Sequence, residues 1–500
     1  MPATRFRDTA HRAETPSRKA KSDRALPVFV FKFYRFAMRL TPLILAVALF
    51  MENMDSTVIA TSLADIARDI GTEPIALKLA LTSYLVALAI FIPVSSWMAD
   101  RFGARNVFRG AMAVFVLGSV ACAHSNSLTA FVAARFLQGM GGAMMTPVAR
   151  LVLVRATPRN ELVNAMAWLT IPGLIGPIVG PPFGGFLTTY LSWHWIFLIN
   201  VPIGILGIWL VGAFLPDTKR NAPRAIDFPG FFLAGSAFAF FVFGVSVVSL
   251  PALPTYYGFI AMVLGVVLGG FYVAHALRVE HPLLDLRLLR FPYFRTAVVA
   301  GTFFRLGLGA TPFLFPLMLQ LVFGMTAFES GMVTFSSAIG ALAAKFVATW
   351  LFERFGFRNT LALATFVTTL GIAAFAFYDA TTPGAIIIGI LIISGFAQST
   401  FWTGSNAFTF ADIDDKDVGG ANVIAQVWGQ LTFALGVALG GGILEASHLM
   451  RGGELVVADF RIAFAIVAAV CAVSVIMFLR LPRDAGRHLA QEGVGASGGE

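Results

Sequence analysis

Two carboxylates stand inside a stretch of sequence that is otherwise apolar. Residues 40–63 form the stretch, and the segment MENMDSTVIA within it carries Glu52 and Asp55, one helical turn apart. A charged acid at the centre of a membrane-spanning helix costs about 2.5–3.5 kcal/mol on insertion scales. Because burial disfavours the charged form, such a carboxyl can take up a proton and release it when water reaches it. The strongest candidate for this proton chemistry is Asp55.

Each of the two acids also has a plainer interpretation. Asp55 could be a structural acid that is bonded to a neighbouring helix. Glu52 points within about 60° of Asp55 on the same helix. It is therefore a second proton carrier, a substrate contact, or a cavity-wall residue that faces water.

Three basic residues fall within apolar segments as well: Arg135, Arg305 and Lys345. An uncompensated guanidinium in a span is costly. A structural ion pair is one interpretation of Arg135, and Gln138, one turn later, could extend a polar network. Arg305 and Lys345 would suit an anionic or metal-chelate substrate. The alternative is that each pairs with an acid on another helix, for instance Arg305 with Glu52.

Further polar or amphipathic side chains in the apolar segments are candidates for the wall of a substrate cavity. Buried polar residues in spans often serve helix packing instead. The candidates, besides Arg305, Lys345 and Gln138, are Gln320, Gln398, Trp402, Asn406 and Gln426.

The elements that must position these residues are membrane-spanning helices. Of the 500 residues, 57% are hydrophobic and 13% are charged, whereas soluble domains are about one quarter charged. Repeated apolar runs of about 20 residues indicate helices that cross a bilayer; transmembrane strands would be about 10 residues long with alternating polarity. The two cysteines, Cys122 and Cys471, lie in apolar runs and indicate neither a disulfide framework nor a metal site. The predicted fold class is an all-α polytopic membrane protein.

Fourteen apolar segments are separated by turns or charge clusters. The boundaries within 228–277 are the least distinct, so twelve or thirteen spans are the alternatives. The predicted segments are 40–63, 75–98, 107–124, 129–152, 162–188, 194–215, 228–249, 255–277, 296–320, 329–351, 359–378, 384–410, 418–446 and 460–480.

The distribution of basic residues orients these spans. With the N-terminus inside, the two tails and the loops after even-numbered spans hold all but seven of the 36 lysines and arginines, as the positive-inside rule requires. An odd number of spans would scramble this pattern, so both termini are expected in the cytoplasm. Most of the net charge of +9 lies in the first 41 residues. We expect a disordered tail there that could touch anionic lipid heads, and no binding of nucleic acid.

A repeat divides the chain into two halves. The stretch ADRFGARN at 99–106 recurs as ERFGFRN at 353–359, and a glycine pattern at 173–185 recurs 256 residues later. Both correspond to a shift of eight spans. Parallel halves with a substrate site between them are typical of one large class of transporters. The predicted divisions are a basic tail at 1–39, six-helix halves at 40–215 and 296–481, two inserted helices at 216–295, and a second tail at 482–500.

Five motifs together suggest a family. SWMADRFGAR at 96–105 is similar to the loop signature Gly-x-Leu-Ala-Asp-Arg-x-Gly-Arg-Lys, although Ser96 replaces its first Gly and Ala104 one closing basic residue. The pattern Arg-x-x-Gln-Gly-x-Gly fills 135–141. The other three motifs are MDSTVI at 54–59, a Gly/Pro-rich stretch at 173–185, and WHWIFLIN at 193–200. Over about residues 40–480 the chain resembles the major facilitator superfamily, and within it the fourteen-helix drug:proton antiporters, most closely multidrug exporters of Gram-negative inner membranes.

The resemblance implies a role for each motif. Arg135 would modulate proton transfer near the acid of the first span. The fifth-span motif would seal and bend the interface between the halves, since its glycines permit close packing and its prolines interrupt the helix; its residues are Gly173, Gly176, Pro177, Gly180, Gly184 and Gly185. The loop motif would latch the cytoplasmic side through charge pairs; its residues are Asp100, Arg101, Gly103 and Arg105.

These observations favour a proton-coupled secondary transporter that exports small molecules by alternating access, either toxic compounds including drugs or organic anions. The outward direction follows from the resemblance alone. An importing proton symporter or facilitator on the same fold is the alternative, and a non-transporting membrane sensor is a more distant one. No phosphate loop, catalytic triad or metal motif stands out, so we expect no enzyme activity and no cofactor beyond the coupling protons.

The expected setting is the inner membrane, where the protein would be a multi-pass functional monomer. Its expected partners are a small-molecule substrate and the lipid bilayer. The sequence carries no signal that identifies a periplasmic adaptor protein.

Overall fold

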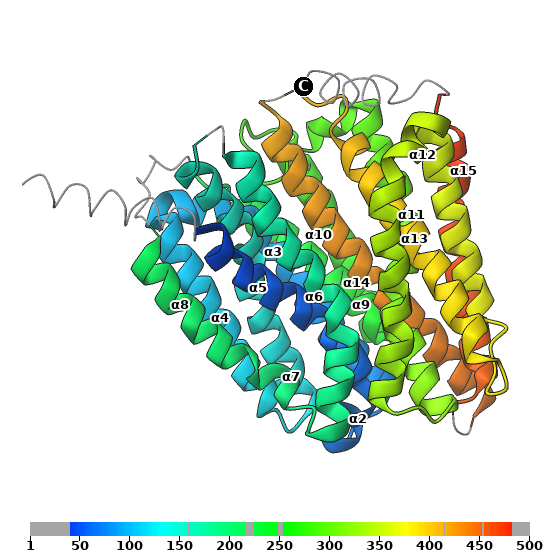
Figure 1. Ribbon diagram of the computed structural model, residues 1–500. Helices are drawn as coiled ribbons and strands as arrows, with labels where there is room; N and C mark the ends of the chain where they lie inside the picture. The colour runs from blue at the N-terminus through cyan, green and yellow to red at the C-terminus, as the bar shows by residue number, and fades with distance from the viewer. Residues whose placement is uncertain are drawn as a thin grey trace, which may run out of the picture.

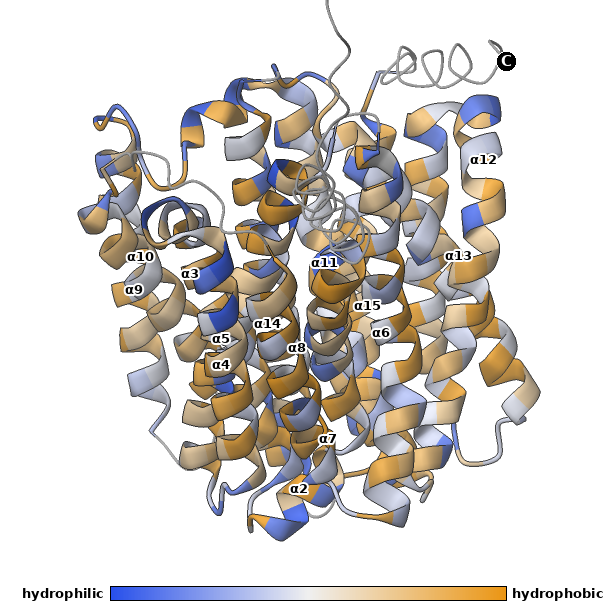
Figure 2. Ribbon diagram, turned by 60° about the vertical axis from the view of Figure 1, so that its left-hand side comes forward, coloured by the Kyte–Doolittle hydropathy of each residue, from blue (hydrophilic) through white to orange (hydrophobic). Residues whose placement is uncertain are grey.

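The computed structural model describes residues 41–158, 161–215, 225–248, 254–414, 416–452 and 455–482, which form a bundle of long helices (Figure 1). The tails predicted at 1–39 and after residue 482 lie outside the described residues. Figure 2 shows apolar residues along the sides of the helices and hydrophilic residues at both ends of the bundle. This distribution is expected of a helix bundle that is surrounded by lipid.

The first half of the chain supplies six spans. They are the first span (Thr41–Thr61), α3 (Lys78–Phe102), α4 (Ala104–Ala123), α5 (Leu128–Ala156), α6 (Leu162–Tyr190), and the short α7 (Trp195–Leu198) continued by α8 (Asn200–Phe214). Between the first span and α3 lie α2 (Leu63–Asp69) and a 3-10 turn, Pro74–Leu77.

The remaining spans follow two helices that stand between the halves. These two are α9 (Phe228–Val247) and α10 (Thr255–Ala276), which a 3-10 turn at Leu286–Arg290 separates from the second half. The second half contains α11 (Pro292–Leu317) with a π-helical turn at Met318–Val322, α12 (Ala327–Phe375), α13 (Gly384–Thr409), α14 (Val418–Arg451) and α15 (Val457–Leu479).

Thirteen described helices are long and apolar enough to cross a membrane, and one of them contains two crossings. α12 has 49 residues, about 74 Å of helix, more than twice the hydrocarbon thickness of about 30 Å. Gly356 breaks it with φ 75° and ψ 165°. The Thr360 hydroxyl donates to the Leu351 carbonyl across this break at 3.1 Å, so the chain reverses there. The predicted fourteen spans are therefore accommodated, with the tenth and eleventh joined at Gly356.

The two ends of the bundle differ in their connections. One end carries α2, at the bottom of Figure 1, and we call it the α2 end. The other end carries the α3–α4 turn and the α12 break, and we call it the Arg101 end. Arg101, Arg105, Arg155 and Arg354 all lie at this second end.

The two halves meet along two seams. α6 packs against α12 along one seam, and α3 packs against α14 along the other. The inserted helix α9 contacts both α3 and α14 and so covers the second seam, while α10 packs on α9 and is largely exposed. The insertion therefore widens the bundle beside the interface between the halves.

An aspartate fixes the start of α9. The Asp227 carboxylate accepts hydrogen bonds from the Gly230 and Leu283 amides and lies 2.7 Å from Nε2 of His275 on α10. Burial acts to raise the pKa of the Asp227 carboxyl, but these hydrogen bonds outweigh it and hold the pKa below its ordinary value. The two inserted helices are thereby joined at the Arg101 end.

The repeat seen in the sequence is also a repeat of backbone geometry. Gly103, between α3 and α4, has φ 87°, and Gly356, at the matching place in the second half, has φ 75°. Left-handed backbone of this kind favours glycine. Both copies of the Arg-Phe-Gly motif therefore end one span and begin the next.

Glycines bring α6 and α14 close to their neighbours. A Cβ at Gly184 would stand 2.5 Å from the Val58 carbonyl oxygen of the first span, and one at Gly180 would overlap Thr57. In the second half, Gly436 and Gly440 approach α11 in the same way. The absence of a side chain thus sets the helix separation in each half.

Gly184→Ala should destabilise the protein, because the new methyl group meets the backbone of the first span. We expect a loss of about 1–3 kcal/mol, as is typical of overpacking. Melting of purified protein can be followed by the reaction of the buried thiols Cys122 and Cys471 with a fluorogenic reagent. Gly110→Ala is the control, since open space surrounds that position; equal melting of the two variants would contradict the role of Gly184.

Candidate transport site

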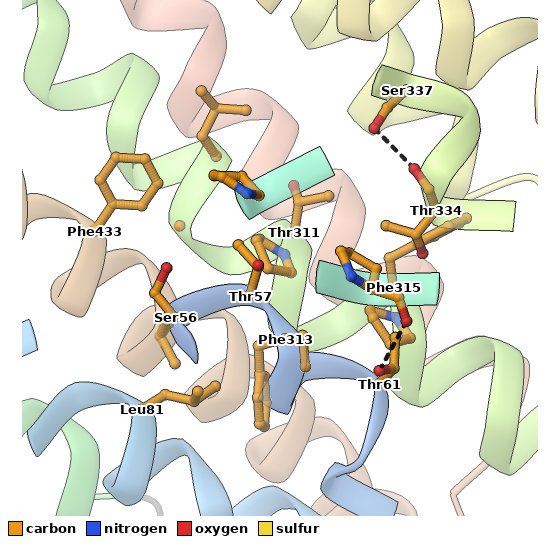
Figure 3. A pocket seen from close by; sticks show the side chains of 18 of the residues that line it. Ser56, Thr57, Thr61, Leu81, Thr311, Phe313, Phe315, Thr334, Ser337 and Phe433 are labelled. Carbon is orange, nitrogen blue, oxygen red and sulfur yellow. Dashed lines mark hydrogen bonds between the residues drawn. The ribbon is translucent and has the colours of Figure 1, made fainter. Parts of the chain in front are cut away.

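A cavity of about 640 Å³ lies between the two halves. The first span, α3 and α6 form one side, and α11 to α14 form the other. Much of the wall is apolar, and Figure 3 shows Leu81, Phe313, Phe315 and Phe433 around the space. Hydroxyl groups interrupt this apolar surface at Ser56, Thr57, Thr61, Thr311, Thr334 and Ser337.

A second cavity of about 240 Å³ adjoins the first. Glu52, Asn53 and Gln430 line both, so these three residues mark the connection. The smaller cavity continues past Arg150 and Thr170, which lie on α5 and α6 towards the Arg101 end. The combined space therefore leads from the centre of the bundle towards the Arg101 end.

At the α2 end, the seam between α6 and α12 is closed. Gly185 packs on the Ala327 carbonyl, and Gly331 packs on the Pro181 carbonyl, each too closely for a Cβ. The Phe328 amide donates to the Thr189 hydroxyl at 3.0 Å. These contacts place backbone against backbone across the two halves.

A buried ion pair lies in the other seam at the same end. Lys78 at the start of α3 and Glu445 near the end of α14 are 0% and 5% exposed, with Nζ 3.7 Å from Oε2. Gly441 packs on the Lys78 side chain, as Gly185 packs on α12. The repeat offset of 256 relates Glu445 to Thr189, so equivalent positions join the halves in both seams.

Asp55 lies in a polar network inside the first half. Its carboxylate accepts from Arg135 Nη1 at 2.7 Å, from Gln138 Nε2 at 2.8 Å and from Asn200 Nδ2 at 2.8 Å. The side chains of Gln138 and Asn200 also donate to the Ser119 hydroxyl. All five residues are buried. Two spans, α5 and α8, thus supply the carboxylate with one cation and two amide donors, and Ser119 adds α4 to the network.

Arg135 connects this network to the large cavity. It lines the cavity wall, whereas Asp55 does not. Its Cζ lies 4.3 Å from the centroid of the Tyr84 ring, a cation–π contact, and Tyr84 lines the cavity too. A change of charge at Asp55 would therefore act on a group at the wall.

Glu52 faces the cavities directly. It lines both of them and accepts a hydrogen bond from the Thr146 hydroxyl at 2.8 Å. It forms no ion pair with Arg305, so the predicted alternative that paired them is wrong. Glu52 belongs to the wall formed by the first half, whereas Arg305 belongs to the second half and, contrary to the prediction, lines neither cavity.

The other two intramembrane cations behave differently from each other. Arg305 is 7% exposed and lies behind Trp402, with its Cζ 5.3 Å from the indole centroid. Lys345 is exposed and donates to the Thr403 hydroxyl at 3.1 Å. It stands two turns beyond the cavity residue Ala338, towards the Arg101 end, and outside both cavities.

The predicted wall residues are only partly brought together. Gln398 and Trp402 line the large cavity, and Gln426 lines the small one. Gln320 instead donates to the Thr61 carbonyl at 2.9 Å and joins the two halves near the α2 end. Asn406 is exposed one turn beyond Trp402. Gln138 belongs to the Asp55 network. Gln320, Asn406 and Gln138 therefore do not line either cavity.

The loop motif makes its contacts within the first half. Asp100 pairs with Arg155 of α5 at 2.6 Å, and Arg105 donates to the Leu215 carbonyl after α8. Arg101 is exposed, and Gly103 turns the chain. In this conformation the motif joins α3 to α5 and α4 to the end of α8 at the Arg101 end. A latch between the halves stays a prediction.

The fifth-span motif lies on α6 between the first span and α12. Gly176 approaches the Met54 amide, and Gly180 and Gly184 follow along the first span, while Gly185 meets α12. Pro177 lines the cavity, and Gly173 lines the smaller cavity. The motif thus contacts the acid-bearing helix, the second half and the cavity together.

Several residues of the site were not predicted from the sequence. Asn200 closes the WHWIFLIN motif, and its position in that run was a usable signal for it. Ser119 and Thr146 are ordinary hydroxyl residues of spans and carry no such signal. Lys78 and Glu445 are 367 positions apart in the chain, and nothing local in the sequence links them.

A comparison with protein-family models decides the family. The model described as Major Facilitator Superfamily matches residues 45–285 and 297–497. The chain belongs to this superfamily. It is therefore a membrane transporter rather than an enzyme, and the family inferred from its motifs is confirmed.

Relatives with curated names cover nearly the whole chain. "Putative multidrug resistance protein MdtD" of Salmonella heidelberg (strain SL476) is 32% identical over 461 residues, which is 89% of this chain and 95% of the relative. The protein of the same name from Escherichia coli O6:H1 is 32% identical over 462 residues, with the same coverage of both chains.

Solved structures share the fold. The D-xylose-proton symporter superposes with a TM-score of 0.64 at 13% identity, over 91% of this chain and 99% of that chain. The human organic anion transporter MFSD10 gives 0.57 at 13% identity, over 88% and 99%. At this identity the likeness concerns the architecture alone.

Asn200→Ala should lower the melting temperature, because it removes a donor from a buried carboxylate. Hydrogen bonds to charged groups contribute about 1.5–3 kcal/mol, and we expect a loss of this size. Asn406→Ala removes an exposed amide and should melt like the parent protein. A parental melting temperature for Asn200→Ala would contradict the network.

Lys78→Met and Glu445→Leu should each be more harmful alone than together. Breaking a buried pair leaves one uncompensated charge and costs about 3–5 kcal/mol, whereas replacing both partners with apolar residues is often neutral. Melting temperatures of the two single variants and the double variant measure this. Additive losses in the double variant would show that the pair is not coupled. Arg68→Ala breaks an exposed pair and should change little.

Proposed function

We propose that this protein is a proton-coupled exporter of small molecules that works by alternating access in the inner membrane of a bacterium. The observation that carries the proposal is the placement of its two intramembrane acids. Asp55 lies in an ion pair directly behind the cavity wall, and Glu52 lies on the wall itself. Relatives named for multidrug resistance support toxic organic compounds as the cargo.

The two acids have different parts in the exchange. Protonation of Asp55 removes the charge that holds Arg135, so the cation is released towards the cavity that it lines. Glu52 can bind either a proton or a positively charged group of a substrate, but not both at once. Exchange requires this kind of mutual exclusion between the proton and the substrate.

The described conformation is the one that receives substrate from the cytoplasm. Its seams are closed at the α2 end, and its cavities extend towards the basic Arg101 end. Basic loops stay in the cytoplasm, which assigns the Arg101 end to that side. Opening of the α2 end would then release substrate outwards and admit a proton.

The driving force is sufficient for concentrative export. One charge that moves through 100 mV supplies about 2.3 kcal/mol, which supports roughly a 50-fold gradient of substrate. Both halves of a single chain line one cavity, which supports a monomer as the functional unit. The cycle uses no cofactor beyond the coupling protons. An adaptor protein in the periplasm is not required by this cycle.

Asp55→Asn should abolish export, because the amide cannot carry a proton. Inverted vesicles that are energised to pump protons inwards should accumulate ethidium or related organic dyes when they contain the parent protein. With Asp55→Asn the accumulation should fall to the background. Asp65→Asn, an acid of α2 in an ion pair with exposed Arg68, is the matched control.

Two outcomes would contradict this function. Full accumulation by Asp55→Asn vesicles would exclude Asp55 as the proton carrier. Proton-driven flux out of inverted vesicles would instead identify an importing symporter on the same fold.

A further inference from the structure

Arg305 is a buried cation without a carboxylate. It is 7% exposed on α11, one turn before Gly309, which lines the large cavity. The structure shows no ion pair between Arg305 and any described residue, and its Nε atom is buried without a hydrogen-bond partner. Its one described electrostatic contact is with the face of Trp402, an aromatic residue of the cavity wall.

The other buried cations of the bundle have acids. Among the described residues, three Lys or Arg side chains are buried: Lys78, Arg135 and Arg305. The first pairs with Glu445 and the second with Asp55. An aromatic face compensates a desolvated guanidinium only in part. Arg305 therefore retains a positive potential next to the cavity.

The opposite wall carries the complementary charge. The first repeat offset, 253, relates Arg305 to position 52, where the first span has Glu52. Glu52 lines both cavities and accepts one hydrogen bond from a neutral hydroxyl. The acid and the base do not form an ion pair with each other, so each can attract an opposite charge on a bound molecule.

We propose that Glu52 and Arg305 select a dipolar substrate, an amphipathic zwitterion whose ammonium group lies at Glu52 and whose carboxylate lies beside Trp402, at the part of the wall behind which Arg305 stands. This inference rests on the proposed transport function and names its substrate class. The apolar body would pack on the phenyl rings of the wall, and a cavity of about 640 Å³ suits a ligand of drug size.

The two charges have different roles in substrate recognition. An ammonium at Glu52 competes with a proton for the same carboxylate, and so contributes to the exchange. A carboxylate at Arg305 meets a group that stays charged at every physiological pH, so it orients the substrate without competing with the proton. Arg305 is thus a specificity-determining residue, and Glu52 couples specificity to the proton.

Three matched fluorescent probes test this. Nα-dansyl-lysine carries a carboxylate and, at the other end of its side chain, an ammonium; dansylcadaverine lacks the carboxylate, and Nα-dansyl-norleucine lacks the ammonium. Binding to purified protein in detergent is measured by dansyl emission, without any gradient. We expect the zwitterion to bind most tightly.

The variants should separate the two charges. Arg305→Gln should weaken the two carboxylate probes on the order of 10- to 100-fold, the range for a lost hydrogen bond to a charged group, and leave dansylcadaverine unchanged. Glu52→Gln should weaken the two ammonium probes and leave the third unchanged. Retained binding of the unaffected probe shows in each case that the variant is folded. Arg461→Gln, at an exposed arginine of α15, is the control and should change none.

Three results would contradict the proposal that the substrate is a zwitterion. It fails if the zwitterion binds no better than the single-charge probes, if none of the three binds, or if Arg305→Gln affects all three alike. Because binding is measured at equilibrium, these outcomes are independent of the direction of transport. Conversely, a failure of proton-driven export would leave the measured charge selectivity as it stands.

Discussion

A buried charge in a membrane protein is costly unless a partner compensates it, and the Asp55–Arg135 pair meets this requirement in the first half. The carboxylate takes donors from α5 and α8, and through Ser119 the network reaches α4. Four spans are therefore held in one arrangement around a single charge. Lipid offers no water that could substitute for a lost partner.

Close approach of backbones is the second constraint, and it defines where the halves can touch. α6 approaches the first span through glycines along one face and meets α12 with Gly185. The same helix lines both cavities at Pro177 and Gly173. A tilt of α6 relative to α12 would therefore alter the seam and the cavity together. This coupling of closure to cavity shape is what alternating access requires.

Pairing of charges between distant helices could not be anticipated from the sequence. The offset between the repeats relates Arg305 to Glu52, yet equivalence under a repeat places two residues in opposite halves rather than in contact. The repeat also gives no indication that Lys78 and Glu445 form a pair. Their pairing depends on where α3 and α14 meet at the α2 end, which no local pattern records.

Local signals in the chain were sufficient for the fold, because hydropathy, glycine and basic loops act over single spans. They indicated fourteen crossings, two repeated halves, an inserted pair of helices and a buried acid in the first span at Asp55. The tertiary structure alone decided which polar residues share a cavity: it places Glu52, Gln398 and Trp402 on the wall and leaves Lys345 and Asn406 beyond it. The physical reason is that a residue's span follows from its own neighbours in sequence. Its partners and its exposure depend on the rotation and spacing of helices that pack against it from elsewhere in the chain.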